Sequence, residues 1–584
     1  MRTGLGRLLS IAIVLAGVLP ATGVAAEGPP FSVRTLHFDT VVGANDDTHC
    51  DVVGDLYTPA SATAATPAPA VLTTNGFGGS KDDQQAMAEA LAQRGYVVLS
   101  YSGLGFGGSG CKIELDDPDW DGKAGSQLVS FLGGTKAATD GTRIDDVRLD
   151  GPGDPRVGMI GGSYGGQIQY AVAGQDPRVD TIVPIITWND LAYSLTPNNT
   201  DLTSGVTSST PGVAKYQWAV LFSAVGVADG IQNIQADPSR DLTTCPNFDD
   251  RVCPGVIEAG ITGQPSAQTL ALLRHASVSS YINKIKIPTL LLQGQADTLF
   301  NLNESVATYT SLRRQGTPVK LVWQSWGHSN STPAPGELGD GDGGYSPVDA
   351  DGNPTAEGRV VEQWLAHYLQ DASEAPALDF SYFRDWVSYS GDATPAYGRA
   401  PSYPAGTNRR WLLSGTDTLA TSKRDVSPGS ASFVTPPAGA PTSVTEISAL
   451  SQDVPLFDAP GTYAQYTSAP LLDDTDVVGA PKVRIKVSAL AAGSPSLFLK
   501  VQDVAPDGTV TQPGRLVAPI RPASLVAPVE VTLPAFVHRF ATGHRIRLVV
   551  AGSDAAYRGS PAPTAVTIAT SQADPGLLTL PVVG

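Results

Sequence analysis

Residues 161–165, GGSYG, have the pattern G-x-S-x-G, in which a serine lies on a tight turn between glycines. A serine hydroxyl in that setting is a candidate nucleophile for acyl transfer. The apolar run 157–160 precedes the motif, and a stretch typical of a helix follows it. The order strand, turn, helix is the one that such a nucleophile requires, so we predict that Ser163 is the nucleophile.

A nucleophilic serine needs a histidine to take its proton and a carboxylate to orient that histidine. With this type of turn, the acid and then the histidine follow the serine in chain order, each on a loop after a later strand. Of the seven histidines, only His328, in LVWQSWGHS, meets this condition. The same condition selects Asp297, at the end of TLLLQGQAD. The sequence therefore predicts a triad of Ser163, Asp297 and His328.

The negatively charged oxygen that forms during acyl transfer needs two hydrogen-bond donors. We expect one donor to be the backbone N–H of Tyr164, which begins a helix whose dipole favours negative charge. We expect the second from the glycine-rich loop TTNGFGGSK, with the N–H of Phe77 as first choice and that of Gly78 as the alternative. Trp188, at the end of a predicted strand, either lines the substrate pocket or packs in the core.

The elements that must position these residues follow a clear rhythm along the chain. From about 68 to 190, short apolar runs alternate with helical patterns, which is typical of a parallel sheet with crossover helices. This rhythm stops over about 190–280, which we interpret as a helical cap insertion, and then resumes. After 376, short alternating strands with Pro and Gly between them indicate a β-sandwich. We therefore predict a domain with a mostly parallel sheet over 27–375, followed by an all-β sandwich or jelly-roll domain over 376–584.

The first 26 residues have the features of a secretory signal peptide. Two arginines precede the apolar stretch LLSIAIVLAGVL, and the small residues VAA precede the expected cleavage site. A membrane anchor is the alternative, but the apolar stretch is shorter than the ~20 residues that a spanning helix needs. No later segment is apolar enough to span a membrane. We expect a secreted protein, either free outside the cell or associated with the cell wall, and the sequence gives no indication of its oligomeric state.

The net charge argues against two classes of partner, and the cysteines predict disulfides. The net charge of −18 disfavours binding to nucleic acid or to anionic membranes. Four cysteines in an exported chain indicate disulfides, for which three pairings exist. Since Cys245 and Cys253 flank a short loop, we pair them, which leaves Cys50 with Cys111.

The sequence gives no reason to expect a cofactor or a metal ion. Cysteine and histidine show no zinc-type spacing. Residues 340–353, DGDGGYSPVDADGN, begin like a calcium-binding loop but lack the later Gly and Glu, so a solvated loop is the simpler interpretation.

The segments RVGMIGGSYGG, IPTLLLQGQAD and WGHS, with the late strand pattern GHRIRLVVAGSD, resemble the X-prolyl dipeptidyl-peptidase and cocaine-esterase-like hydrolases. The resemblance extends from about residue 32 to the end. It implies an α/β-hydrolase domain, a helical cap and a C-terminal jelly roll, with the same three residues as triad. Two departures stand out. Phe77 takes a position where relatives use a tyrosine hydroxyl as oxyanion donor, and Ser102 and Leu104 replace the Asp and Arg of a D-x-R-G-x-G-x-S loop.

We therefore expect a secreted serine hydrolase that cleaves a small ester or a short peptide through an acyl-enzyme. An X-prolyl peptidase must hold a free ammonium group with carboxylates, for which the cap offers Asp190 and Glu258. An acyl esterase needs only an apolar pocket, and the sequence leaves both activities open. The alternative is a non-catalytic protein that binds carbohydrate or cell wall through its jelly roll, but an intact triad in the correct order argues against it.

Overall fold

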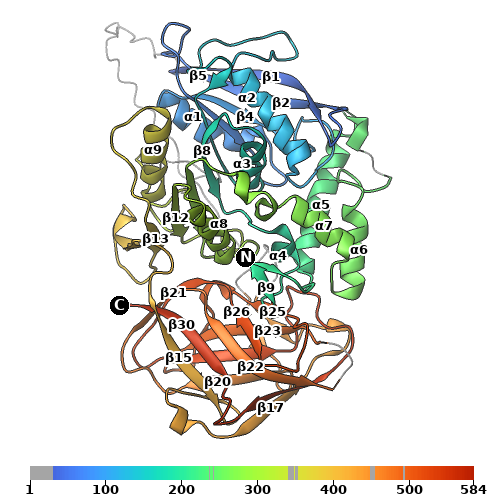
Figure 1. Cartoon of the computed structure of the whole chain (residues 1–584), viewed down its shortest axis with the longest axis vertical. Helices are drawn as coiled ribbons and strands as arrows, with labels where there is room; N and C mark the ends of the chain where they lie inside the picture. Colours follow the sequence, from blue (N-terminus) through green and yellow to red (C-terminus); the bar gives the residue numbers. More distant parts are fainter. Residues whose placement is uncertain are drawn as a thin grey trace, which may run out of the picture.

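The computed structural model describes residues 30–584, apart from 236, 241–242, 340–347, 349–352, 447–453 and 491–493. The predicted signal peptide lies outside the described residues. So does the acidic loop over 340–353, except for Val348 and Asn353. The chain forms a sheet covered by helices, drawn in blue to yellow in Figure 1, and a β-rich C-terminal part, drawn in orange and red. No helix in the described part of the chain combines the length and the apolar character needed to cross a bilayer.

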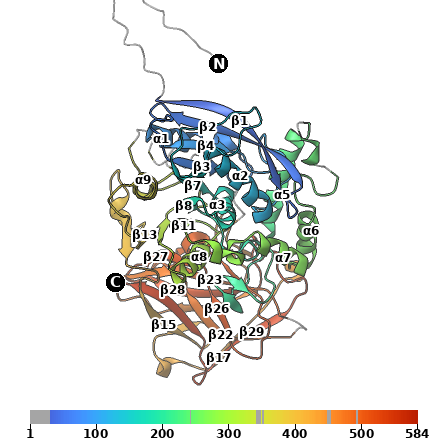
Figure 2. The same ribbon diagram turned by 45° about the horizontal axis from the view of Figure 1, so that its top comes forward.

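Ten described strands form the first sheet, in the order β1-β2-β4-β3-β7-β8-β11-β12-β13-β14. The strands from β4 to β13 run parallel, while β1, β2 and β14 are antiparallel to their neighbours. Figure 2 shows the long β1–β2 pair at one edge of this sheet. The strands are β1 (Phe31–Val42), β2 (Thr48–Pro59), β3 (Ala70–Thr74), β4 (Val97–Tyr101), β7 (Val157–Gly162), β8 (Val179–Ile185), β11 (Thr289–Gly294), β12 (Val319–Gln324), β13 (Phe380–Phe383) and β14 (Tyr397–Ala400).

Helices cover both faces of this sheet because successive side chains of its buried strands point to opposite faces. Leu72, Leu99 and Met159 lie in the same core cluster as residues of α2, α3 and α8. Their chain neighbours Val71 and Val98 lie in another cluster, with residues of α1 and α9. The helices are α1 (Gln85–Gln93), α2 (Lys123–Leu132), α3 (Tyr164–Gln175), α8 (Leu302–Arg314) and α9 (Ala356–Leu369). This arrangement confirms the predicted α/β-hydrolase fold.

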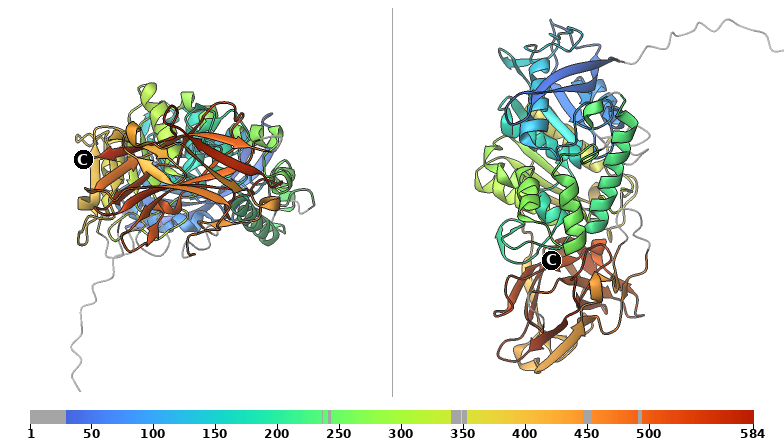
Figure 3. Two further views of the ribbon diagram at one scale, coloured as in Figure 1. Left: turned by 90° about the horizontal axis from the view of Figure 1, so that it is seen from below. Right: turned by 90° about the vertical axis from the view of Figure 1, so that its right-hand side faces the viewer.

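The segment between β8 and β11 forms a cap, in agreement with the predicted interruption of the strand–helix rhythm. Its described α-helices are α4 (Leu191–Leu195), α5 (Tyr216–Asn233), α6 (Val252–Thr262) and α7 (Ala267–His275). Figures 1 and 3 show α5, α6 and α7 beside the sheet and reaching towards the C-terminal domain.

Hydrogen bonds fasten the cap to the C-terminal domain. The N–H of Arg558 donates to the carbonyl of Ala214 (2.8 Å), and its side chain donates to the carbonyl of Gly260 (2.9 Å). The side chain of Gln217 donates to the carbonyl of Ala555 (2.6 Å). The two ends of α5 and α6 that face this domain are therefore held by it.

The sheet continues past residue 375, where we expected the catalytic domain to end. Both β13 and β14 extend the first sheet, and the C-terminal sheet begins only with β15. The four residues of β13, FSYF, are all buried. Without a long helical pattern beside them, these two short strands look like the start of the β-rich region that follows.

The C-terminal domain is built from strands around a core of its own, as predicted for the region after the hydrolase domain, and all but one of its described strand pairs are antiparallel. Fourteen described strands form its main sheet. These strands are β15 (Thr407–Ser414), β16 (Thr418–Ala420), β17 (Gly429–Val434), β20 (Tyr463–Ser468), β21 (Thr475–Gly479), β22 (Lys482–Ala489), β23 (Leu497–Val504), β24 (Val510–Thr511), β25 (Ala518–Ile520), β26 (Val529–Thr532), β27 (Phe536–Phe540), β28 (Arg545–Ala551), β29 (Ala565–Thr570) and β30 (Leu577–Val583).

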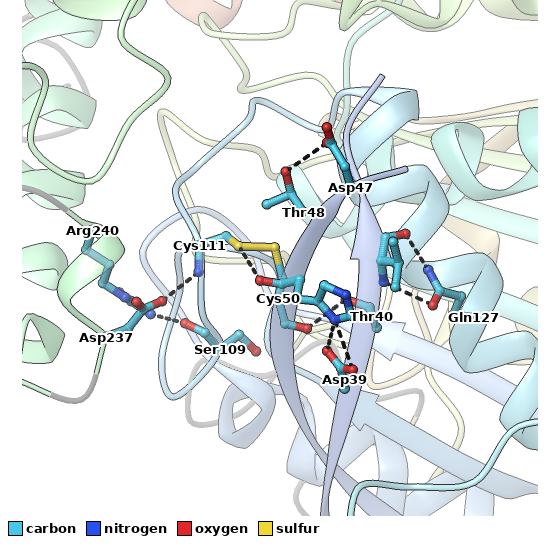
Figure 4. Close-up of a disulfide and its surroundings, with 12 residues drawn as sticks. Asp39, Thr40, Asp47, Thr48, Cys50, Ser109, Cys111, Gln127, Asp237 and Arg240 are labelled. Atoms are coloured by element: carbon cyan, nitrogen blue, oxygen red, sulfur yellow. Dashed lines mark hydrogen bonds and ion pairs between the residues drawn. A yellow bond between two sulfur atoms is a disulfide. The ribbon is translucent and has the colours of Figure 1, made fainter. Parts of the chain in front are cut away.

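Two disulfides are present, with the pairing expected from the sequence. Cys50 on β2 is bonded to Cys111 in the loop after β4, as Figure 4 shows. The same loop is held by the cap, since the N–H of Cys111 donates to Asp237 (2.7 Å) and the buried Arg240 donates to the carbonyl of Ser109. The second disulfide joins Cys245 to Cys253 and closes a loop in front of α6.

Candidate active site

Ser163 lies on the turn between β7 and α3, in a strained backbone conformation with φ 56° and ψ −117°. The glycines of the motif are required by close packing around this turn. A Cβ atom on Gly161 would lie 2.8 Å from the carbonyl oxygen of Gly165, and one on Gly165 would lie 2.4 Å from that of Thr74. Strained backbone of this kind is typical of functional sites, where surrounding structure holds it in place.

The structure brings Ser163, His328 and Asp297 into one chain of hydrogen bonds. Nε2 of His328 lies 2.8 Å from Oγ of Ser163, and Nδ1 lies 2.6 Å from Oδ2 of Asp297. Asp297 is fully buried, and its Oδ1 accepts the N–H groups of Leu299 (3.0 Å) and Phe300 (2.7 Å). An imidazole placed in this way can take the proton of a serine hydroxyl while the carboxylate stabilises its charge.

The loops that carry Asp297 and His328 pack directly on each other. A Cβ atom on Gly327 would lie 2.7 Å from Cβ of Asp297, so only glycine fits there. The imidazole ring is also held from two sides, because the rings of Phe300 and Trp218 meet it edge-on at centroid distances of 5.0 and 6.3 Å. The histidine is therefore positioned by packing as well as by its two hydrogen bonds.

The glycine-rich loop after β3 passes beside Ser163. A Cβ atom on Gly76 would lie 3.8 Å from Cβ of Ser163. Within this turn, the N–H of Gly79 donates to the carbonyl of Gly76 (3.1 Å). Among the described residues, the N–H groups of Phe77 and Tyr164 form no backbone hydrogen bond outside the helices and strands.

A pocket opens from Ser163 into the cap. Phe77 is one of its lining residues, and its ring lies 5.0 Å from that of Phe222 and 6.1 Å from that of Phe248. The lining residues are mostly apolar or aromatic, and the described ones include no Asp or Glu. They are Phe77, Leu115, Ser163, Tyr164, Trp188, Leu191, Leu195, Thr196, Ala214, Lys215, Tyr216, Ala219, Phe222, Ser223, Phe248, Arg251, Val252, Gly255, Val256, Ala259, Thr269, Leu272, Leu273 and Phe300.

Two parts of the sequence match models of known protein families. Residues 49–330 match the model described as X-Pro dipeptidyl-peptidase (S15 family). Residues 398–574 match the model of the X-Pro dipeptidyl-peptidase C-terminal non-catalytic domain. The chain belongs to the X-Pro dipeptidyl-peptidase (S15) family. It is therefore a serine hydrolase of the peptidase or esterase kind, and the non-catalytic interpretation is set aside.

Solved structures with the same fold cover nearly the whole chain of this family member. An aminopeptidase from a marine sediment archaeon, Thaumarchaeota archaeon, aligns over 98% of this chain and 99% of its own, with a TM-score of 0.61 and 14% identity. An α-amino acid ester hydrolase aligns over 97% and 100%, with a TM-score of 0.62 and 16% identity. A CocE/NonD family hydrolase from Staphylococcus aureus aligns over 97% and 99%, with a TM-score of 0.59 and 13% identity. No curated protein matches the sequence.

The two cap carboxylates that we considered for an ammonium group lie away from the cavity of this hydrolase. Asp190 is buried at the start of α4, where its carboxylate accepts the N–H of Ala192 (3.0 Å) and the hydroxyl of Thr207 (2.5 Å). Glu258 is exposed on α6. Trp188, in contrast, does line the cavity, and its ring lies 5.0 Å from that of Phe300.

One residue at the site was missed by sequence reasoning. Lys215 is fully buried at the start of α5, and its ammonium donates to the carbonyls of Thr298 (2.6 Å) and Leu299 (3.0 Å). Burial lowers the pKa of Lys215 to about 8, although the carboxylates of Glu446 and Asp297 oppose this shift. A single lysine in a segment without strong strands gives no signal that could have identified this role.

One group of described residues has ligand atoms close enough together to suggest a cation. It consists of Asp117, Asp119 and the half-exposed His275. His275 lies 3.2 Å from Asp117, and this contact raises the pKa of His275. An ion pair accounts for the arrangement, and the family fold does not require a metal ion for serine-based hydrolysis.

Proposed function

We propose that the protein is a carboxylic ester hydrolase that works through an acyl-enzyme on Ser163. His328 takes the proton of Ser163 as Oγ attacks the ester carbonyl, and Asp297 holds the imidazole and stabilises its positive charge. The N–H groups of Tyr164 and Phe77 bind the oxygen that becomes negative. His328 then protonates the leaving alcohol and activates the water that releases the acid.

The observation that carries this proposal is the chain of hydrogen bonds from Ser163 to Asp297 at the end of a cavity. Its distances, 2.8 Å and 2.6 Å, are those at which proton transfer from serine to histidine is efficient. Because the side chain of Phe77 has no hydroxyl group to donate, oxyanion binding here relies on backbone donors.

The cavity supports an apolar acyl group rather than a free ammonium group. An ammonium group that leaves water needs a compensating charge, since burying an unpaired ion is costly. No carboxylate lines the cavity among the described residues, and its two charged lining side chains, Lys215 and Arg251, are both positive. Aromatic and aliphatic side chains instead offer favourable burial for an acyl chain, at roughly 25 cal/mol per Å².

The first experiment tests the nucleophile. We expect a fluorophosphonate probe to label the folded protein, and Ser163→Ala to abolish both labelling and ester hydrolysis. Asp190→Asn is the matched control, because it changes a buried polar residue of the neighbouring segment outside the proposed machinery. Absence of labelling in the folded wild type would refute the proposal.

The second experiment tests the substrate class. p-Nitrophenyl esters of increasing chain length are compared with Xaa-Pro anilides that carry either a free or an acetylated amino group. We expect turnover of the esters, and no advantage of the free amine over the acetylated one. Faster cleavage of the free-amine anilide would identify a dipeptidyl-peptidase instead.

We also propose that the enzyme works outside the cytoplasm, as the predicted signal peptide indicates. Its two disulfides support this location, because disulfides persist in oxidising compartments and are rare in reducing ones. Fractionation of the producing cells tests the proposal, which requires activity in the extracellular or wall fraction and a mature chain that begins near Glu27.

A further inference from the structure

Three segments from distant parts of the chain meet behind Asp297 and His328. The first carries Asp297 and Thr298, the second carries His328 and Ser329, and the third is the C-terminal domain segment that carries Thr445 and Glu446. Thr298, Ser329 and Glu446 are all buried, with exposed fractions of 6%, 7% and 2%. Glu446 does not line the cavity that opens from Ser163.

Hydrogen bonds join the three segments at Thr298. Its hydroxyl donates to Oε2 of Glu446 (2.6 Å), and its N–H donates to the hydroxyl oxygen of Ser329 (3.0 Å). The two hydroxyl oxygens lie 2.5 Å apart, and that of Ser329 lies 3.4 Å from the same Glu446 oxygen. The direct chain neighbours of Asp297 and His328 are therefore bonded to each other and to one carboxylate.

The cap holds the same segment from its other side. The ammonium of Lys215 donates to the carbonyls of Thr298 and Leu299, and the N–H of Leu299 donates in turn to Asp297. Lys215 also lies close enough to Glu446 for the glutamate to raise its pKa. The positive charge of the lysine thus partly balances the buried carboxylate that faces Thr298.

Glu446 is itself held by its own domain. The side chain of Arg515 donates to the carbonyl of Thr445 (2.7 Å), and the hydroxyl of Thr445 donates to Asp554 (2.9 Å). Asp554 is completely buried. The C-terminal domain therefore presents the carboxylate of Glu446 from a fixed backbone.

We propose that Glu446, which belongs to the domain described as non-catalytic, is a positioning residue for hydrolysis. By accepting the hydroxyl of Thr298, it fixes the loop of Asp297 against the loop of His328 and so keeps both at the distances that proton transfer requires. This inference rests on the proposed function of Ser163, Asp297 and His328. Its physical basis is that small displacements of catalytic groups reduce rates steeply, by about 100-fold for 1 Å.

The test compares Glu446→Ala with Glu446→Gln in the full-length chain, using a p-nitrophenyl ester. We expect the alanine variant to lose about 10- to 100-fold in kcat with KM unchanged within about twofold, because Glu446 lies outside the cavity. The glutamine variant keeps an oxygen that can accept the Thr298 hydroxyl, so we expect its kcat to stay within about threefold of wild type. A purely structural role would not produce this rescue together with an unchanged KM.

Two further variants make the result specific. Asp503→Asn changes another buried carboxylate of the same domain, which pairs with His538 and His544 and does not touch the catalytic loops. We expect it to keep the wild-type kcat. Thr298→Val removes the hydroxyl group that donates to Glu446. The loss of kcat in Thr298→Val and the loss of kcat in Glu446→Ala should therefore not add in the double variant.

Fluorophosphonate titration gives the fraction of active sites in each preparation, so kcat refers to folded enzyme only. The proposal is overturned if Glu446→Ala keeps the wild-type kcat, if Asp503→Asn loses as much, or if the losses of Glu446→Ala and Thr298→Val add. If Glu446→Ala does not fold, Thr298→Val alone decides, and a wild-type kcat for it overturns the proposal. Failure of the proposed function is distinguishable, because the wild type itself would then show neither labelling nor ester turnover.

Discussion

The hydrogen bonds around Asp297 allow the effect of Asp297→Asn to be worked out atom by atom. Oδ1 of Asp297 accepts two N–H groups, those of Leu299 and Phe300, while Oδ2 faces Nδ1 of His328. Asparagine has one oxygen and one NH₂ group on the same frame. Its oxygen must take the position that accepts two donors, so its NH₂ group must face His328.

This orientation forces the wrong tautomer on the histidine. Since the NH₂ group donates, Nδ1 of His328 has to accept, and the ring proton moves to Nε2. Nε2 then points an N–H at Oγ of Ser163, 2.8 Å away, and can no longer take the serine proton. Loss of the carboxylate also removes the charge that stabilises the imidazolium. We expect kcat to fall by about 10⁴-fold, which corresponds to about 5.4 kcal/mol of transition-state stabilisation.

The assay measures kcat and KM with a p-nitrophenyl ester after titration of folded sites. Because Asp297 does not contact the cavity, KM should change little. Asp190→Asn, an isosteric change of another buried carboxylate, is the control and should keep activity within about threefold. If Asp297→Asn retains more than about one tenth of the wild-type kcat, the tautomer argument is wrong.

Three further predictions concern packing, covalent links and buried charge. Gly165→Ala places a Cβ atom 2.4 Å from the carbonyl oxygen of Thr74, so we expect a destabilisation of about 1–3 kcal/mol and at least a tenfold loss of kcat in the folded fraction, measured by urea unfolding and ester turnover. Replacing both cysteines of each disulfide by serine should cost about 4 kcal/mol for Cys50–Cys111, which spans 61 residues, and about 2.5 kcal/mol for Cys245–Cys253, which spans 8. Equal losses in urea unfolding would contradict the loop-length argument. Burial raises the pKa of Glu304 to about 8, so the folded chain keeps a proton that the unfolded chain releases near pH 4.3. The stability from this group is complete below about pH 4 and is lost as the pH rises towards 8; unfolding free energies at several pH values should fall less steeply for Glu304→Gln, and parallel curves would count against this account.

Much of this architecture could be predicted because it depends on local patterns. Buried parallel strands have continuous apolar runs, and crossover helices have a periodic apolar face, so the sheet domain and its cap could be recognised from residues 68–370. The order of Ser163, Asp297 and His328 along the chain depends on the same pattern, because each follows a strand. The structure places their side chains within hydrogen-bonding distance.

The remaining features depend on contacts that no local pattern encodes. Glu446 bonds to a residue 148 positions earlier in the chain, and nothing around either residue indicates that contact. From the sequence alone, Lys215 would be expected to lie in solvent. Its burial depends on the packing of the cap against the loop of Thr298. The domain boundary was expected about 30 residues too early, because β13 and β14 are short strands. That β13 pairs with β12, and β14 with β13, cannot be deduced from their own sequence.

The attachment of the cap at both ends has a consequence for how substrates are selected. Asp237 and Arg240 tie it to the disulfide-bonded loop beside β2, and Arg558 and Gln217 bind it to the other domain. We expect a cap that is bonded on two sides to move little when a substrate binds. We therefore expect the pocket that opens from Ser163 to accept acyl chains up to a fixed length, so that turnover of p-nitrophenyl esters falls beyond that length.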